Sequence, residues 1–294
     1  MDKIHIPVLL EESIMALNIK PNSFYIDCTL GDGGHSYKML SQLSSQGFLL
    51  SIDRDQNAID FVKGNYEIPF NWILEKENFS NIKNVLKRKG VSRKPNGILM
   101  DLGLSSRQLE SSNNRGFSYQ EDHEPLDMRM DTDLNVSALD LLKALNEKEL
   151  SKLFKIYGEE RYAKPISRAI KENISEINTV GDLTSLIYTV VPVASNNKNP
   201  SRRVFQALRI AVNDELNSLK EGLDNAFEVL SADGRLAVIT FHSLEDRIVK
   251  QFFNDKKDQK TGKVLSKKPI TPSQEELEQN HRASSAKLRI IEKI

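Results

Sequence analysis

The sequence has almost no cysteine, because Cys28 is the single one among 294 residues. Disulfide frameworks and cysteine-based zinc sites both need several thiols, so neither is expected, and a reducing compartment is favoured. Net charge is absent too, since 41 Lys and Arg residues balance 41 Asp and Glu residues. Any surface that binds a polyanion must therefore be local.

Long apolar runs are also missing. A membrane-spanning helix needs about 20 consecutive, mostly apolar residues, and no stretch approaches that length. The beginning, MDKIHIPVLLEES, turns acidic after a very short apolar run, which is too short for the apolar region of a secretory signal. Hydrophobic residues make up 39% and charged residues 28% of the chain, which is ordinary for a globular protein. We therefore expect a cytoplasmic protein without membrane contacts.

What the sequence does have is regular alternation over its first hundred residues. Strands are expected at 24–28, 48–53, 70–74 and 97–102, and a helical pattern follows each of the first three. Such alternation is typical of βαβ units around a parallel sheet. The predicted fold class is therefore α/β, a doubly wound, Rossmann-like sheet.

The alternation stops after the fourth strand. Between about 105 and 205 the pattern favours helices, and the strand signal is weak. A helix is then expected over 208–230 and a strand over 235–241, and a helix follows whose Ser243 to Asp246 start resembles a capping box. SAKLRIIEKI is a candidate last strand. The predicted domains are 1–104 with 208–294, which form the sheet domain, and 105–207, which form a helical insert.

A glycine-rich loop, LGDGGHS, follows the first strand, where ligands of open parallel sheets bind. Glycine allows the backbone to approach a ligand closely. No Gly-Lys-Ser/Thr follows, which excludes a P-loop, and Ser36 replaces the third glycine of a dinucleotide fingerprint. Asp32 would repel a pyrophosphate. S-adenosyl-L-methionine (AdoMet) fits better, because it carries a sulfonium and an ammonium group and no phosphate, with Gly33 and Gly34 beside it.

Two further residues, one at the end of the second expected strand and one after the third, are suited to bind AdoMet. Asp53 ends the second strand, 20 residues after Gly33, where a carboxylate can accept both ribose hydroxyls. Phe79, just past the third strand, can pack against an adenine ring.

Asp101 ends the fourth strand, in MDLGLSSRQLE. Enzymes that methylate exocyclic amines commonly place Asp, Asn or Ser here, because hydrogen-bond acceptors near the N–H groups localise the amine lone pair. The Pro-Pro-aromatic sequence that usually follows is missing. Asp101 is thus a candidate catalytic residue, with the alternative that it only contacts the cofactor or caps a turn. A base that is flipped out of its stack is held between apolar or aromatic side chains. The candidates for this contact are Phe117, Tyr119, Phe241 and His242. Packing in the protein core is the alternative explanation for these residues.

Two basic segments are candidates for contacts with RNA. The lysine-rich segment 255–273 is either a solvated loop or an RNA-contacting flap. KNPSRRVFQALR, at 198–209, carries four basic residues and no acid, so it is the better candidate for phosphate contacts.

Many long motifs together resemble the MraW/RsmH family, the AdoMet-dependent methyltransferases of the exocyclic N4 amine of cytosine in small-subunit ribosomal RNA. The resemblance runs nearly end to end. It rests on HIPVLLEE, YIDCTLGDGGHS, IDRD, DLGLSSRQL, RGFSY, PLDMRMD, YGEER, FQALRIAVNDEL, FHSLEDRIVK and RASSAKLRI.

This resemblance implies a class I methyltransferase sheet, no metal, and a specific cytidine of 16S ribosomal RNA, within the assembled small subunit, as the target. It also implies that the insert 105–207 helps to recognise the RNA. A monomer and a homodimer both stay open, and so do two other functions: a nicotinamide-dependent oxidoreductase, which Asp32 and Ser36 disfavour, and a non-catalytic RNA-binding assembly factor. The implied cofactor contacts are Gly33, Gly34, His35, Asp53, Phe79, Asp101 and Gln108.

Overall fold

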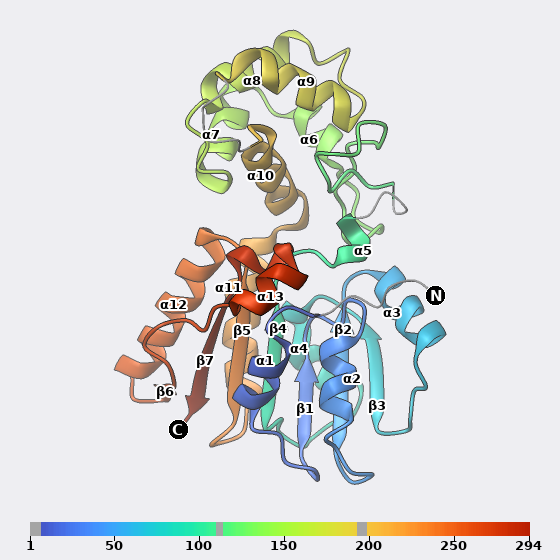
Figure 1. Cartoon of the computed structure of the whole chain (residues 1–294), viewed down its shortest axis with the longest axis vertical. Helices are drawn as coiled ribbons and strands as arrows, with labels where there is room; N and C mark the ends of the chain where they lie inside the picture. Colours follow the sequence, from blue (N-terminus) through green and yellow to red (C-terminus); the bar gives the residue numbers. More distant parts are fainter. Residues whose placement is uncertain (1–6, 110–113, 193–198) are drawn as a thin grey trace. The chain divides into compact units, whose positions relative to one another are not determined.

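Seven strands form one sheet with the order β3-β2-β1-β4-β5-β7-β6 (Figure 1). The first five pair in parallel, and β7 runs antiparallel to both β5 and β6. The predicted parallel α/β sheet is therefore confirmed. The strands are β1 (Phe24–Asp27), β2 (Phe48–Asp53), β3 (Trp72–Lys76), β4 (Gly97–Asp101), β5 (Arg235–Thr240), β6 (Gly262–Val264) and β7 (Lys287–Lys293).

The computed structural model describes residues 7–109, 114–192 and 199–294. It divides into two compact units, which we call the sheet unit (Met1–Gly103 with Leu216–Ile294) and the helical unit (Leu104–Glu215). Within the described residues, the helices are all too short or too polar to cross a membrane.

The sheet is buried on both faces, as parallel sheets are. Apolar side chains of α1 (Leu10–Leu17), α2 (Gly34–Leu40) and α3 (Gln56–Asn65) cover one face. Those of α4 (Ile82–Arg88), α11 (Glu215–Val229) and α12 (Ser243–Asp258) cover the other. The interior strand β1 consequently has all four residues buried.

The strand order reverses direction between β1 and β4, which are neighbours in the sheet. At such a switch point the connections leave toward opposite sides, which opens a crevice beyond the carboxyl ends of the strands. The last residues of four parallel strands therefore lie along the same edge of the sheet, where the strands have their carboxyl ends. These strands are β1, β2, β4 and β5.

Two local predictions were wrong. The helix expected over 208–230 is interrupted, because Asp214 adopts a left-handed conformation (φ 47°) between α10 (Ser201–Asn213) and α11. The lysine-rich segment 255–273 is also not one continuous loop, since α12 extends to Asp258 and β6 follows.

Helices dominate the helical unit, which has its own apolar core. The sequence placed the second domain boundary between residues 207 and 208. The side chain of Leu208, however, packs in the core of the helical unit, and the unit continues to Glu215. Its helices are α5 (Ser106–Leu109), α6 (Ala138–Ala144), α7 (Glu147–Tyr157), α8 (Ala163–Glu172), α9 (Val180–Val190) and α10.

The loop between α5 and α6 is held by buried polar side chains in its described part. Asn213, at the end of α10, accepts a hydrogen bond from the N–H of Met130 (2.8 Å) and donates one to the carbonyl of Met128 (2.7 Å). Glu124 accepts one from the N–H of Gly116 (2.6 Å). These bonds replace the backbone pairing that the irregular chain lacks.

Candidate active site

Three carboxyl groups lie at the carboxyl ends of neighbouring strands: Asp27 on β1, Asp53 on β2 and Asp101 on β4. The sheet order brings them together, although they are up to 74 residues apart in the sequence. Together they form the acidic edge of the sheet unit.

Asp27 is completely buried, and its carboxyl group stabilises the fold through hydrogen bonds. Its carboxyl group accepts hydrogen bonds from the hydroxyl of Ser36 (2.6 Å) and the N–H of Thr29 (3.1 Å), which tie the end of β1 to α2. Burial outweighs these bonds and raises the pKa of Asp27 to about 7.

Asp53 holds the glycine loop. Its two carboxyl oxygens each accept one backbone N–H, from Gly31 (2.8 Å) and from Asp55 (2.9 Å). Burial raises the pKa of Asp53 to about 6. A carboxylate has about four lone-pair sites, so acceptor capacity remains for two hydroxyls, as the ribose prediction requires.

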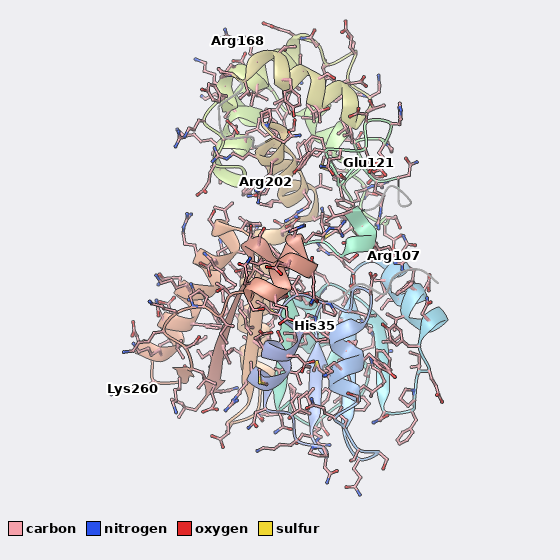
Figure 2. The ribbon with its side chains drawn as sticks, in the orientation of Figure 1. His35, Arg107, Glu121, Arg168, Arg202 and Lys260 are labelled. Atoms are coloured by element: carbon pink, nitrogen blue, oxygen red, sulfur yellow. The ribbon has the colours of Figure 1, made fainter. Side chains whose placement is uncertain are left out.

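Asp101 is paired with His35, as His35 Nδ1 lies 3.6 Å from Asp101 Oδ2 (Figure 2 places His35 in α2). The backbone N–H of Asp101 donates to the hydroxyl of Thr29 (2.7 Å). Burial, with the nearby carboxyl groups of Asp27 and Glu245, raises the pKa of Asp101 well above its usual range. Burial lowers the pKa of His35 to about 4, so its imidazole is neutral.

Packing within the protein explains why glycine occurs at the two positions that were predicted to contact AdoMet, Gly33 and Gly34. Gly33 has φ 84°, and a Cβ there would lie 2.9 Å from a methyl group of Val62. A Cβ on Gly34 would lie 2.2 Å from the ring of Pro7. Close packing within the protein therefore requires both glycines, whether or not a ligand approaches them.

Phe79 lies beside the end of β2. The N–H of Glu77 donates to the carbonyl of Asp53 (2.9 Å), and a single 3₁₀ turn begins at Phe79. A Cβ on Gly222 would lie only 2.5 Å from the ring of Phe79, so that ring packs directly on α11. One face of the aromatic ring is fixed in this way, and the ring remains half-buried.

Gln108 belongs to the helical unit. Its side-chain oxygen accepts a hydrogen bond from the N–H of Ser105 (3.0 Å), and its own N–H donates to the Ser105 hydroxyl (3.3 Å). These bonds explain Gln108 as part of a turn, and its contact with a cofactor stays a prediction.

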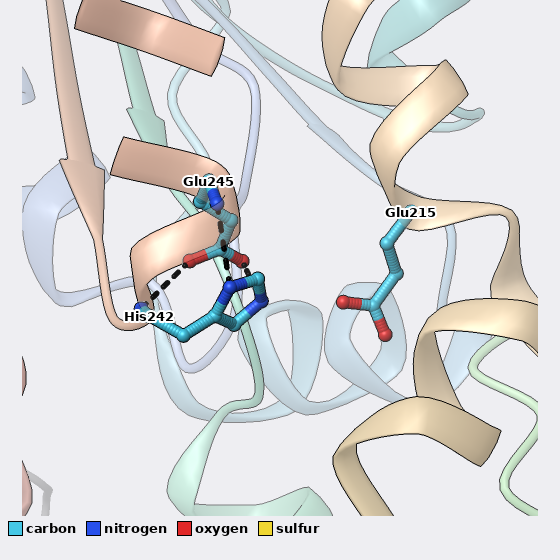
Figure 3. A group of neighbouring side chains, drawn as sticks. All are labelled: Glu215, His242 and Glu245. Atoms are coloured by element: carbon cyan, nitrogen blue, oxygen red, sulfur yellow. Dashed lines mark hydrogen bonds and ion pairs between the residues drawn. The ribbon is translucent and has the colours of Figure 1, made fainter. Parts of the chain in front are cut away.

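The capping box after β5 begins one residue earlier than the sequence suggested. His242, not Ser243, is the N-cap of α12, and the N–H of Glu245 donates to His242 Nδ1 (3.3 Å) (Figure 3). The buried carboxyl group of Glu245 accepts from the N–H groups of Phe241 (2.9 Å) and His242 (3.2 Å). Asp246 instead pairs with cations of β7.

Glu245 was missed as part of this edge. The H-x-x-E spacing directly after a strand was the available signal, because a residue three positions after an N-cap reaches back to it. Of the candidates for base contacts, Phe241 and His242 stand at the end of β5 in the sheet unit. Phe117 and Tyr119 lie in or against the core of the helical unit.

The basic segment 198–209 divides into two kinds of residue. Arg202 and Arg203 are exposed on α10 (Arg202 is labelled in Figure 2). Arg209 forms a two-pronged ion pair with Glu215 (2.7 and 2.8 Å), so it is already engaged. Lys198 lies outside the described residues.

The acidic edge suits a ligand with positive charge and hydroxyl groups. Its carboxyl groups have raised pKa values because they are buried and because they repel one another, and a cation would relieve both costs. Asp101 Oδ1 and His35 Nε2 are buried without a hydrogen-bond partner among the described residues. A pyrophosphate would add repulsion here, so the edge opposes a dinucleotide and fits AdoMet.

A family model described as the MraW methylase family matches residues 2–294. Two curated relatives carry the name "Ribosomal RNA small subunit methyltransferase H". The one from Brevibacillus brevis is 43% identical, over 99% of this chain and 98% of the relative. The one from Caldicellulosiruptor saccharolyticus is 46% identical, over 99% of each. A solved structure, an rRNA methylase from Streptococcus thermophilus, is 12% identical with a TM-score of 0.45, over 99% of this chain and 98% of that one.

Proposed function

The chain belongs to the MraW methylase family, and we propose that it transfers a methyl group from AdoMet to the exocyclic N4 amine of one cytidine in 16S ribosomal RNA. The family and fold-class predictions are confirmed. The observation that carries the proposal is the acidic edge, where Asp53 and Asp101 end the two parallel strands on either side of β1, around a loop without phosphate-binding features.

Five residues of the sheet unit would hold the cofactor. Asp53 would accept hydrogen bonds from the ribose hydroxyls, and Phe79 would offer the adenine its free face. Gly33, Gly34 and His35, at the start of α2, would form the wall of the pocket. When bound, AdoMet supplies an electrophilic methyl group on a positively charged sulfur.

Asp101 would act on the acceptor. A cytosine amine is a weak nucleophile, because its lone pair is delocalised into the ring. A carboxyl oxygen that accepts a hydrogen bond from the amine localises that lone pair on nitrogen. Asp101 Oδ1 is buried and without a partner among the described residues, so it is the atom that we assign to this contact.

The helical unit would recognise the RNA. Its surface carries exposed cations on α7, α8 and α10, and contacts of Lys and Arg with phosphates supply a large share of the affinity for nucleic acids. The relatives' name indicates a small-subunit RNA substrate. We propose the assembled subunit as the form that is methylated, in the cytoplasm. The cations are Lys148, Lys152 and Lys155 on α7, Lys164 and Arg168 on α8, and Arg202 and Arg203 on α10, with Arg161 between α7 and α8.

Mass spectrometry of 16S RNA tests the reaction and the target together. Small subunits isolated from cells without the protein are incubated with AdoMet and the purified chain. We expect one new N4-methylcytidine, formed far more slowly with Asp101→Ala. Methylation at carbon or at another base overturns the N4 assignment, and absence of any new methyl group overturns the activity. Free 16S RNA, used in parallel, tests whether assembly is required.

A further inference from the structure

One hydroxyl group joins the strand that carries Asp101 to the glycine-rich loop. The backbone N–H of Asp101 donates a hydrogen bond to Thr29 Oγ1 at 2.7 Å. Thr29 follows the end of β1, where the loop begins, and Asp101 is the last residue of β4. A side chain of the loop therefore holds the backbone of the residue that we assign to the acceptor amine.

The pairing of β1 with β4 explains why a side chain is needed at this point. The register ends with Asp27 opposite Leu99, and the N–H of Cys28 then donates to the carbonyl of Leu99 (2.9 Å). Two residues later, the N–H of Leu30 donates instead to the carbonyl of Ile52 on β2 (2.9 Å). The chain after β1 thus turns from β4 toward β2. Beyond this turn, a side chain that reaches back to β4 takes the place of the backbone ladder.

The hydroxyl of Thr29 is held in the orientation that this bond requires. A hydroxyl group has one hydrogen to donate and two lone pairs. One lone pair accepts the N–H of Asp101, and the hydrogen donates to Asp27 Oδ1 over a longer distance (3.4 Å). The same Asp27 oxygen accepts the backbone N–H of Thr29 (3.1 Å), while Oδ2 accepts from the hydroxyl of Ser36 on α2 (2.6 Å). Asp27 therefore fixes Thr29 from below the loop.

The end of β4 is held on its other side as well. The N–H of Leu102 donates to the carbonyl of Ile239 on β5 (3.0 Å). The chain then turns at Gly103, which has φ 99°. The bonds to Thr29 and to β5 thus fix the strand end just before this turn. Such placement matters, because a displacement of about 1 Å at a reacting group can cost about 10²-fold in rate.

We propose that Thr29 is a positioning residue for methyl transfer, whose hydroxyl holds Asp101 where the acceptor amine meets it. This inference rests on the proposed function. It gives Thr29 a task on the acceptor side of the reaction, and no bond of the reactants forms or breaks at Thr29 itself.

The first test measures the hydrogen bond without any reaction. In the cofactor-free chain, hydrogen exchange followed by NMR should show a protected amide at Asp101. Thr29→Val has nearly the same shape without the hydroxyl, so exchange at Asp101 should accelerate about tenfold or more, while Ile98 within β4 stays unchanged. Thr29→Ser should keep the protection. An unprotected Asp101 amide in the unaltered chain, or equal protection in Thr29→Val, overturns the inference.

The second test separates positioning of Asp101 from cofactor binding. Thr29→Val should lower kcat with small subunits about 10- to 100-fold, and so should Thr29→Ala, which removes the hydroxyl without a branched side chain. Thr29→Ser keeps the hydroxyl and should stay within about threefold of the unaltered chain. Calorimetry should show AdoMet affinity within about threefold in all three variants, because Asp53 and Phe79 are unchanged. Thr271→Val, at an exposed position of the sheet unit, is the control.

A double-mutant cycle distinguishes this role from general support of the fold. If Thr29 acts through Asp101, adding Thr29→Val to Asp101→Ala should lower the residual kcat by less than about twofold, because no carboxyl group is left to position. A loss that multiplies the loss in Asp101→Ala would mean that Thr29 acts elsewhere, which overturns the inference.

The failures are distinguishable. No transfer by the unaltered chain overturns the proposed function, and the task of Thr29 with it. Transfer with an unchanged kcat in Thr29→Val and Thr29→Ala overturns the inference alone. So does a loss of AdoMet affinity that accounts for the whole defect.

Discussion

The two units treat buried polar groups in different ways. In the sheet unit, the carboxyl groups at the strand ends and His35 are buried at a cost, with displaced pKa values. In the helical unit, Asn213 is buried with several hydrogen bonds to backbone atoms. The acidic edge of the sheet unit thus contains carboxyl groups whose burial is unfavourable. In the helical unit, by contrast, the buried amide of Asn213 stabilises the fold through its hydrogen bonds.

This difference supports the proposed place of the chemistry, at the acidic edge of the sheet unit. Groups with strongly displaced pKa values gather at functional sites, because the displacement suits them to bind charge or to move protons. The buried amide of Asn213, which has its hydrogen bonds within the helical unit, stabilises that unit. Substitutions in the sheet unit should therefore change catalysis and ligand binding, and those in the helical unit should change stability and RNA binding.

The largest effect is expected for Asp101→Ala. Loss of the acceptor for the amine hydrogen should lower kcat about 10²- to 10⁴-fold, measured as methyl transfer to small subunits. The exposed residue Asp60 supplies the control, Asp60→Ala. Turnover that survives in Asp101→Ala would mean that Asp101 contacts the cofactor or the fold only.

Asn213→Ala should have the next largest effect, confined to the helical unit. It leaves the N–H of Met130 and the carbonyl of Met128 without their partner, which should cost about 3 kcal/mol of unfolding free energy. Hydrogen exchange should accelerate in α10 and not in β1. The exposed Asn178 provides a matched control in the same unit, and equal effects of the two substitutions would contradict the assignment.

Asp53→Ala should weaken AdoMet binding by about 1–3 kcal/mol, which is about 5- to 150-fold, because the ribose hydroxyls lose their acceptor. Calorimetry gives the dissociation constant directly, again with Asp60→Ala as the control. An unchanged affinity would remove Asp53 from the cofactor site. Such a result would also weaken the contrast between the units, because the acidic edge would lose its ligand.

Asp27→Asn should have the smallest effect on turnover, and its effect on stability should appear only as a change with pH. The folded pKa of Asp27, about 7, exceeds the ordinary 3.8. Its contribution to stability is therefore complete below about pH 4 and is lost as pH rises through about 7. The uncharged variant escapes this loss, so between pH 5 and 8 it should gain about 2–3 kcal/mol on the unaltered chain. Urea unfolding of the variant and of the unaltered chain, at about pH 5 and about pH 8, measures this difference in the free energy of unfolding. A constant difference would show that Asp27 titrates normally.

The alternation of buried strands and amphipathic helices was enough to predict the sheet, because periodicity reports directly on burial. Asp53 and Asp101 were found in the same way, since each directly ends an apolar strand. Helix ends were less predictable. Asp214 belongs to a residue type that tolerates the left-handed conformation, but this tolerance alone does not show that one helix is divided there into α10 and α11. Leu208 reveals its unit only by its packing partners.

The sequence by itself determined the family, the parallel sheet and the identity of the acids at the strand ends, because these depend on local pattern and on motifs. Only the tertiary structure decided that Gly34 is required by Pro7, that His242 begins α12, and that His35 faces Asp101. Such contacts join residues from different elements. Their distances follow from how the strands and helices pack around β1, and the order of residues along the chain does not specify that packing.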